Sequence, residues 1–336
     1  MPIINPAQEK SCGHWRRAQL INVSKESMSY SDFAIPIDWP THLPHQKVAR
    51  YFDMYAEHFQ LREHIRFGAR VVDVRELHDE NNRWVVRWHP VASPAALEET
   101  EIKEEIFDYV MMCSGHHWKP RYPEFPGMDP SAPDTYTGDQ IHSHFYRQTD
   151  VYRNKTVVVV GLGNSGVDLA VELSLNQSEF IFSLLFKILC PPTHENMKPE
   201  ALPLGCHPTV STLVYERIST GTIKPSKNIN KIGPGKKILF EDGTEVEADT
   251  VLCCTGYHIT LPVLDSDIVT DGKPDAQDNN EVWTWKSMVP PRHPNLVFIG
   301  LSQSLGAFMP LAEMQSRFSA DARRQVGTVA IRGANG

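Results

Sequence analysis

Apolar residues follow two different periodicities along the first third of the chain. Between residues 46 and 59 they fall three and four positions apart, a spacing that predicts an amphipathic helix. Three short runs rich in β-branched and aromatic residues follow, at 69–74, 83–88 and 105–113, and polar segments connect them. Such runs predict β-strands. Because the connections leave little room for crossover helices, we expect an antiparallel meander.

The central and C-terminal parts of the chain alternate strand-like runs with glycine-containing turns. Residues 157–172 read VVVVGLGNSGVDLAVE, so a run of valines ends directly in a glycine-rich turn that a helical pattern follows. Asp242-Gly243 lies between two short runs, at 238–240 and 245–247, and predicts a β-hairpin. Two further strand-like runs, at 250–254 and 295–299, are each followed by glycine. This alternation predicts the α/β class. The tail after residue 324 lacks periodicity, and we expect no regular structure there.

The composition suits a globular protein, with 41% hydrophobic and 22% charged residues among 336. The formal net charge is −8 and no run of lysine and arginine forms a basic patch, so we expect no nucleic-acid partner. The longest apolar stretch, residues 180–190, is interrupted by Lys187 and is too short to span a membrane. The first residues carry no secretory signal pattern, and we therefore expect a soluble, cytoplasmic protein.

The six cysteines include no C-x-x-C pair. Cys253 and Cys254 are neighbours on an expected strand, so their side chains should point to opposite faces. This pattern argues against a dithiol redox centre and against a zinc site, and we expect no metal. Small buried apolar residues in a reducing compartment explain most of these cysteines.

The glycine-rich turn carries the clearest chemistry in the sequence. Gly161 permits a tight turn out of the strand, Gly163 lets the backbone approach a pyrophosphate, and Gly166 allows close packing of helix on strand. The N-terminus of the following helix offers N–H groups and partial positive charge to phosphates. The alternative is a glycine-rich turn that binds nothing. The second strand is expected within residues 179–188, and the sequence there does not decide between NADH and NADPH.

A second pattern lies just before this turn and reads Tyr136-x-Gly138-x-x-x-His142-x-x-x-Tyr146. Earlier in the chain, the block NVSKESM begins at Asn22 and is followed by SDFAIP. Three more segments belong to this pattern. The segment CSGHHWKP precedes the glycine motif, and the segments CCTGY and GLSQSLGAFMPLAEMQSRF follow it. Together these motifs resemble the flavin-containing monooxygenases, and the resemblance covers the chain from about residue 19 to residue 318.

The resemblance implies a chemistry and a set of site residues. Family members use NADPH to reduce FAD, and a flavin hydroperoxide then oxygenates a soft nitrogen or sulfur centre. The substrates implied are O₂ and a small-molecule amine or sulfide. Asn22 would be the catalytic residue, at the junction of flavin and nicotinamide. The residues that the resemblance assigns to cofactor binding are Gly161, Gly163, Asn164, Ser165, Gly166, Asp168, His142, Tyr146 and Gln303.

The sequence departs from the family pattern at its start. Members open with a strand, a GxGxxG turn and a helix for FAD, and this chain has no such segment, so it resembles an N-terminally truncated member. We therefore expect two dinucleotide-binding domains: an incomplete FAD domain from residues 1–140 and 256–336, and an NADPH domain from residues 141–255. We also expect weak FAD binding. An incomplete sheet leaves an unpaired edge, which would allow a homo-oligomer to form.

Three alternatives stay open from the sequence. A Baeyer–Villiger oxygenase has a similar fingerprint but carries Trp at the position of Tyr146. A dithiol flavoprotein reductase would need the C-x-x-C pair that this chain lacks. A non-catalytic NADPH-binding remnant would need only the glycine motif.

Overall fold

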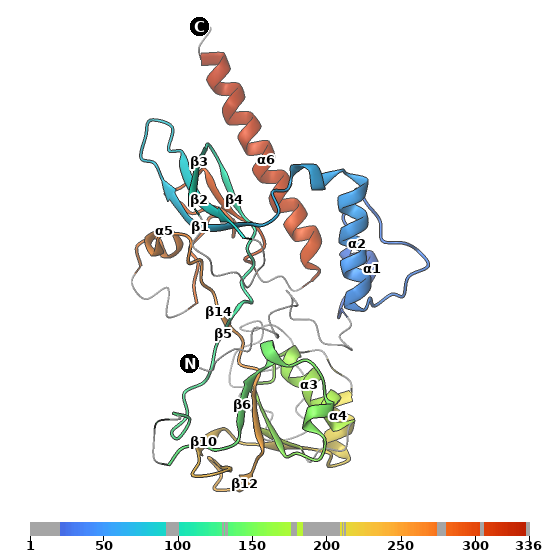
Figure 1. Ribbon diagram of the computed structural model, residues 1–336. Coiled ribbons are helices and arrows are strands. Elements are labelled where there is room, and N and C mark those ends of the chain that lie inside the picture. Colours follow the sequence, from blue (N-terminus) through green and yellow to red (C-terminus); the bar gives the residue numbers. More distant parts are fainter. Residues whose placement is uncertain are drawn as a thin grey trace. The chain divides into compact units, whose positions relative to one another are not determined.

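The computed structural model describes residues 21–91, 101–129, 131, 134–175, 180–183, 209, 211, 213–273, 280–302 and 306–333. The chain divides into two compact units (Figure 1). Among the described residues, unit 1 comprises 21–119 and 258–333, and unit 2 comprises 120–257. Helices and strands occur in both units, and the predicted α/β class is confirmed.

Unit 2 is built on a five-stranded parallel sheet with the order β6-β13-β7-β8-β9. Two helices pack with it, α3 (Asn164–Ser174) and α4 (Leu213–Ser219). The central strand shows why the sheet forms here, since all four valines of β7 are at most 1% exposed. A strand buried on both faces is typical of a parallel sheet that is covered on both sides. The five strands are β6 (Asp139–His142), β7 (Val157–Val160), β8 (Phe180–Ser183), β9 (Ile223–Ser226) and β13 (Thr250–Cys253).

Successive valines of β7 belong to two different hydrophobic clusters, one on each face of the sheet. Val157 and Val159 belong to the cluster that contains residues of α3 and α4, whereas Val158 and Val160 belong to the cluster on the other face. That second cluster includes residues of a small antiparallel sheet, made by β10 (Ile229–Ile232), β11 (Lys237–Phe240) and β12 (Glu245–Glu247). β11 and β12 are the hairpin predicted around Gly243, which has φ +81°.

The antiparallel meander predicted for unit 1 is confirmed, with one correction. β1 (Ala69–Glu76), β2 (Trp84–Pro90) and β3 (Lys103–Phe107) pair in this order. The expected third strand, 105–113, is in fact two strands in different sheets. β4 (Val110–Met112) leaves the meander and pairs in parallel with β15 (Leu296–Phe298). The interruption falls at two residues between β3 and β4, where the chain turns into a different sheet.

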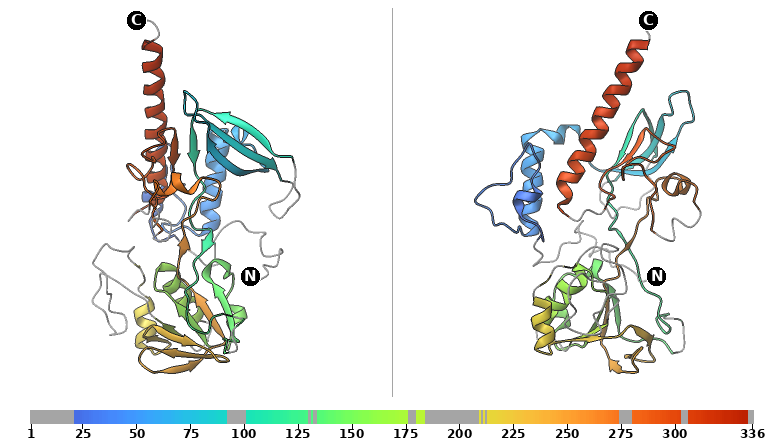
Figure 2. Two further views of the ribbon diagram at one scale, coloured as in Figure 1. Left: turned by 90° about the vertical axis from the view of Figure 1, so that its left-hand side faces the viewer. Right: turned by 180° about the vertical axis from the view of Figure 1, so that it is seen from behind.

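The main helices of unit 1 are α1 (Lys25–Met28), α2 (His45–His58), α5 (Ser266–Thr270) and α6 (Phe308–Gly333). Of these, α1, α2 and the start of α6 contribute to a core of aromatic and aliphatic residues around Tyr51, which is 0% exposed. α2 confirms the helix predicted over 46–59. α6 corrects the expectation for the tail, because it continues as one helix to Gly333. In the right-hand view of Figure 2, α6 passes between α2 and the antiparallel sheet of unit 1.

A buried lysine fixes the segment between α1 and α2. Lys25 is 7% exposed, and its ammonium donates to the carbonyl oxygens of Pro36, Ile37 and Trp39 at 3.2, 2.6 and 2.5 Å. Burying a charge is costly unless hydrogen bonds replace its water, and three carbonyls do so here. The lysine of the Asn22 block therefore has a structural task in unit 1.

Five short elements complete the secondary structure of the described residues: η2 (Leu61–His64), β5 (Lys119–Pro120), η3 (Ser143–Phe145), η4 (Asp150–Tyr152) and β14 (Tyr257–His258).

No described helix has the length and apolar character needed to cross a membrane.

Candidate functional site

The glycine-rich turn of unit 2 joins β7 to α3 and is shaped by two tightly packed glycines. Gly161 has φ +98°, and a Cβ added there would lie 2.5 Å from the carbonyl oxygen of Cys254. A Cβ on Gly166 would lie 1.9 Å from the carbonyl oxygen of Gly161. Side chains do not approach backbone so closely, so both positions require glycine. Strand, turn and helix are thereby packed directly on one another.

Gly163 differs because the space beside it is empty. It is the N-cap of α3, with φ −64° and ψ 173°, and no atom lies within 4 Å of the point where a Cβ would be. The N-cap residue Gly163 supplies no side-chain hydrogen bond to the first turn of α3, where the positive end of the helix dipole lies. Asn164 is half-buried, and Ser165 and Asp168 are exposed. The turn can therefore receive an anionic group such as a pyrophosphate.

His142 ends β6 and is 0% exposed. Its Nδ1 accepts a hydrogen bond from the backbone N–H of His144 at 3.1 Å, which assigns the ring proton to Nε2. The rings of Tyr122 and Tyr257 lie 5.5 and 5.3 Å away, measured between ring centroids. Burial lowers the pKa of His142 to about 4, and the backbone of Gly256 opposes this shift only in part. The imidazole is therefore neutral at physiological pH.

The other fingerprint residues are also packed inside unit 2. A Cβ on Gly138 would lie 2.3 Å from the hydroxyl oxygen of Tyr136, and that hydroxyl donates to the carbonyl of Ala248 at 2.8 Å. Tyr146 is 1% exposed and stacks on Tyr152, with ring centroids 5.5 Å apart and an interplanar angle of 11°. These contacts give the fingerprint a structural role in unit 2, whatever further role it has.

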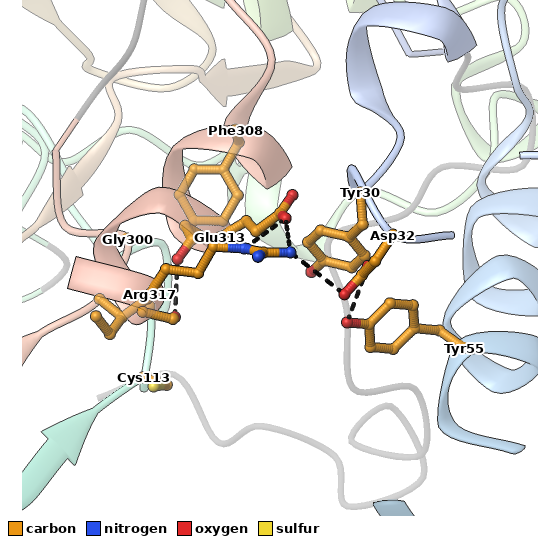
Figure 3. Close-up of a pocket in the computed structure, with 12 residues that line it drawn as sticks. Tyr30, Asp32, Tyr55, Cys113, Gly300, Phe308, Glu313 and Arg317 are labelled. Atoms are coloured by element: carbon orange, nitrogen blue, oxygen red, sulfur yellow. Dashed lines mark hydrogen bonds and ion pairs between the residues drawn. The ribbon is translucent and has the colours of Figure 1, made fainter. Parts of the chain in front are cut away.

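Unit 1 contains a cavity of about 610 Å³ at the carboxyl ends of two parallel strands (Figure 3). Cys113 and Gly115 follow β4, and Ile299 and Gly300 follow β15. In α/β proteins, ligands bind at this end of parallel strands. The remaining walls come from α2, α6 and the segment before α2, and include Tyr30, Asp32, Tyr55, Phe308, Glu313 and Arg317.

A charged network forms one wall of this cavity (Figure 3). The guanidinium of Arg317 lies 2.7 Å from Glu313 and 3.4 Å from Asp32. Glu313 also accepts hydrogen bonds from Ser31, from its backbone N–H at 2.9 Å and from its hydroxyl. These bonds from Ser31 lower the pKa of Glu313 below its usual value. Two carboxylates thus face one guanidinium, and acidic groups are in excess.

Two phenols adjoin this charged network in the cavity wall. The rings of Tyr30 and Tyr55 lie 4.8 Å apart, and the Tyr55 hydroxyl donates to Asp32 at 3.5 Å. Burial raises the pKa of Tyr30 to about 12 and also raises the pKa of Tyr55. Both phenols are therefore protonated at neutral pH, and the cavity offers aromatic faces together with hydrogen-bond donors.

Sequence reasoning missed the residues of this cavity wall. The one local signal was the spacing of Glu313 and Arg317, which are four positions apart on a helix and therefore lie on the same face. Nothing in the sequence connected this pair with Ser31, because 282 positions separate Ser31 from Glu313.

Two further predicted site residues are Asn22 and Gln303. Asn22 is exposed and does not line the cavity of unit 1. Gln303 lies outside the described residues. Within the part of the chain that the structure describes, no group of three His, Cys, Asp or Glu side chains could hold a metal ion.

Comparisons with known proteins agree on one group. A family model described as flavin-binding monooxygenase-like matches residues 7–185 and 193–331. Flavin-containing monooxygenase 5 of Cavia porcellus is 31% identical over 352 residues, which covers 90% of this chain and 62% of that protein. N-oxide-forming dimethylaniline monooxygenase 2 of Pan troglodytes is 30% identical over 348 residues, with 89% and 62% covered. The chain thus spans less than two thirds of the length of these relatives.

The fold also has solved counterparts. S-allyl-L-cysteine S-oxygenase from Allium sativum matches with a TM-score of 0.69 and 23% sequence identity, over 92% of this chain and 62% of that one. At this identity the likeness concerns the fold alone.

Proposed function

The chain belongs to the flavin-binding monooxygenase-like family, and on that premise we propose that it oxygenates soft nucleophilic nitrogen or sulfur centres with FAD, NADPH and O₂. The name of one relative supports this substrate class, since the dimethylaniline monooxygenase 2 of Pan troglodytes is N-oxide-forming. The substrate would be a small-molecule amine or sulfide.

The observation that carries the proposal is the geometry of the glycine-rich turn. Gly161 and Gly166 pack against backbone, whereas Gly163 is open to a ligand. This is the division of tasks that a dinucleotide-binding turn requires. The N–H groups around Gly163 and Ser165 would hold the pyrophosphate of NADPH, with the positive end of α3 behind them. When bound, NADPH supplies a hydride and FAD carries the oxygen chemistry.

The cavity of unit 1 is the candidate site for the flavin ring. Its aromatic lining by Tyr30, Tyr55 and Phe308 suits a planar aromatic ring, and the space beside Gly115 is open. The described residues of unit 1 contain no strand, glycine-rich turn and helix of the kind that begins at Gly161. The proposal for this cavity therefore concerns the ring system and not the phosphates of FAD.

The division into domains follows from the same proposal. The division expected from the sequence assigns NADPH to residues 141–255 and FAD to residues 1–140 with 256–336. In the structure unit 2 extends over residues 120–257, so residues 120–140 and Gly256 would belong to the NADPH-binding unit. Asn22 remains the proposed catalytic residue, and His142, Tyr146 and Gln303 remain proposed cofactor residues.

The test begins with a visible absorption spectrum of the purified chain, taken after incubation with FAD and removal of free cofactor. Because weak FAD binding is expected, only part of the flavin absorbance should be retained. NADPH oxidation, measured with excess FAD, should depend on a tertiary amine or a sulfide and yield the N-oxide or sulfoxide. A folded chain that retains FAD and NADP⁺ but oxygenates neither substrate would contradict the proposed reaction. Ester formation from a cyclic ketone would instead identify a Baeyer–Villiger oxygenase.

The second candidate function is nucleotide binding without redox catalysis. It is favoured because, among the described residues, a turn with two tightly packed glycines and an open one between them occurs once, at Gly161–Gly166. A colourless protein that binds NADP⁺ and shows no NADPH oxidation would identify a nucleotide-binding chain without redox catalysis.

A further inference from the structure

The turn that follows β13 lies directly beside the glycine-rich turn. β6, β13 and β7 are neighbouring parallel strands, and His142, Cys253 and Val160 stand in register at their carboxyl ends. The N–H of Cys254 donates to the carbonyl of Val160 at 2.7 Å, and the carbonyl of Cys254 is the atom that a Cβ on Gly161 would meet. Because neighbouring strands are only about 4.8 Å apart, the residues after Cys254 form the next wall along this edge.

Gly256 is the open point of this second turn. It is exposed, has φ +78°, and has no atom within 4 Å of the point where a Cβ would be. The turn is fixed by residue 121: the N–H of Arg121 donates to the carbonyl of Gly256 at 3.0 Å, and the Thr255 hydroxyl donates to the carbonyl of Arg121. Gly256 therefore combines a fixed backbone with empty space beside it, as Gly163 does.

His142 supports the same turn from inside unit 2. It is fully buried, and its ring packs against the rings of Tyr122 and Tyr257, the second of which directly follows Gly256. Packing on the buried side and the two hydrogen bonds with the backbone of Arg121 together leave the turn little freedom. A ligand that lies against Gly256 would therefore meet a preorganised surface.

The order of the strands tells which half of a dinucleotide would reach this turn. In dinucleotide-binding folds, the residue that contacts the adenosine ribose comes from the end of the second strand. Here the second strand is β8, which pairs with β7 on the side opposite β13. A dinucleotide with its pyrophosphate at Gly163 then directs its adenosine half toward β8 and its other half toward β13.

We propose that the Thr255–Gly256 turn receives the nicotinamide riboside half of NADP(H) and positions it. This inference rests on the proposed binding of NADPH at the glycine-rich turn and assigns a second contact surface to the same site. Gly256 is a positioning residue, because its backbone would lie against the ligand without taking part in hydride transfer.

The test compares Gly256→Asn with Gly243→Asn. Gly243 is a matched control: it is exposed, has φ +81° and has no atom within 4 Å of its Cβ position, but it lies in the β11–β12 hairpin. Asparagine tolerates positive φ better than other non-glycine residues, so both variants should fold. Calorimetric titrations measure the binding of NADP⁺ and of adenosine 2′,5′-bisphosphate, which lacks the nicotinamide half.

We expect Gly256→Asn to weaken NADP⁺ binding by about tenfold or more and to leave adenosine 2′,5′-bisphosphate binding within about twofold. Gly243→Asn should change neither. NADP⁺ binding by Gly256→Asn at the wild-type affinity would overturn the proposal, as would equal weakening of both ligands. A folded wild-type chain that binds neither ligand would instead refute the proposed NADPH site itself.

Discussion

The carbonyl oxygen of Gly161 lies 1.9 Å from the point where a side chain on Gly166 would begin. This approach brings the N-terminus of α3 against the end of β7, and it leaves Gly163, between them, facing open space. Packing and ligand binding are thus assigned to different glycines of one turn.

The two tasks can be separated by substitution. Gly166→Ala forces a methyl group into backbone and should lower the free energy of unfolding by about 1–3 kcal/mol, as overpacking does. Gly163→Ala meets no atom within 4 Å and should leave stability within about 0.5 kcal/mol while weakening NADP⁺ binding. Urea denaturation and NADP⁺ titration measure the two effects. Equal stability losses in both variants would contradict this division.

Lys25 provides a prediction for unit 1. Lys25→Met removes the ammonium that satisfies the carbonyls of Pro36, Ile37 and Trp39, so the free energy of unfolding should fall by about 2–4 kcal/mol. Lys224→Met, at an exposed position of β9, serves as the control for loss of a positive charge and should change stability by less than about 0.5 kcal/mol. Thermal unfolding of both variants measures the difference. A Lys25→Met protein as stable as the control would show that the three carbonyls find other partners.

His142 predicts a pH dependence. Its pKa is lowered from 6.5 to about 4 in the folded protein. Below pH 6.5 the unfolded chain binds a proton that the folded protein does not, so stability should decrease as the pH falls from 6.5 toward 4. Urea midpoints across this range measure the slope, which His142→Gln should reduce.

A second measurement tests His142 without a substitution. NMR titration of its ring should show no protonation above about pH 5, given a folded pKa of about 4. Protonation with a midpoint near 6.5 would mean that the ring is not buried as the structure describes.

Cys113 reports on occupancy of the cavity in unit 1. Its side chain lines the cavity and is exposed, and partial burial raises its pKa. Cys253 is buried, which raises its pKa to about 12. Iodoacetamide at pH 8 should therefore modify Cys113 much faster than Cys253, as peptide mass spectrometry measures. Saturating FAD should slow the modification of Cys113 and leave Cys253 unchanged. An unchanged rate at Cys113 would place the flavin ring elsewhere.

The parts of the structure that the sequence predicted are strands, turns and helices that depend on residues close together in the sequence. The run of four valines, the spacing of Gly161, Gly163 and Gly166, and the Asp242-Gly243 turn each determine a strand or turn within a few residues. The helix over α2 follows from its apolar spacing in the same way. These features gave the α/β class and the candidate dinucleotide turn.

The parts that sequence did not predict depend on distant partners. Residues 105–113 look like one strand, but β3 pairs with β2 while β4 pairs with β15, and no local pattern distinguishes the two partners. The contact of Ser31 with Glu313 joins residues 282 positions apart. The cavity wall therefore becomes visible only once the chain is folded.

Among the described residues, unit 2 is continuous in sequence, and unit 1 is made from segments on either side of it. β4 is therefore synthesised long before β15, its parallel partner, leaves the ribosome. The five-stranded sheet of unit 2 can form before β15 is available to pair with β4, because domains fold as units during synthesis. Translation speed and chaperone binding should then affect the maturation of the outer segments more than that of the nucleotide-binding centre.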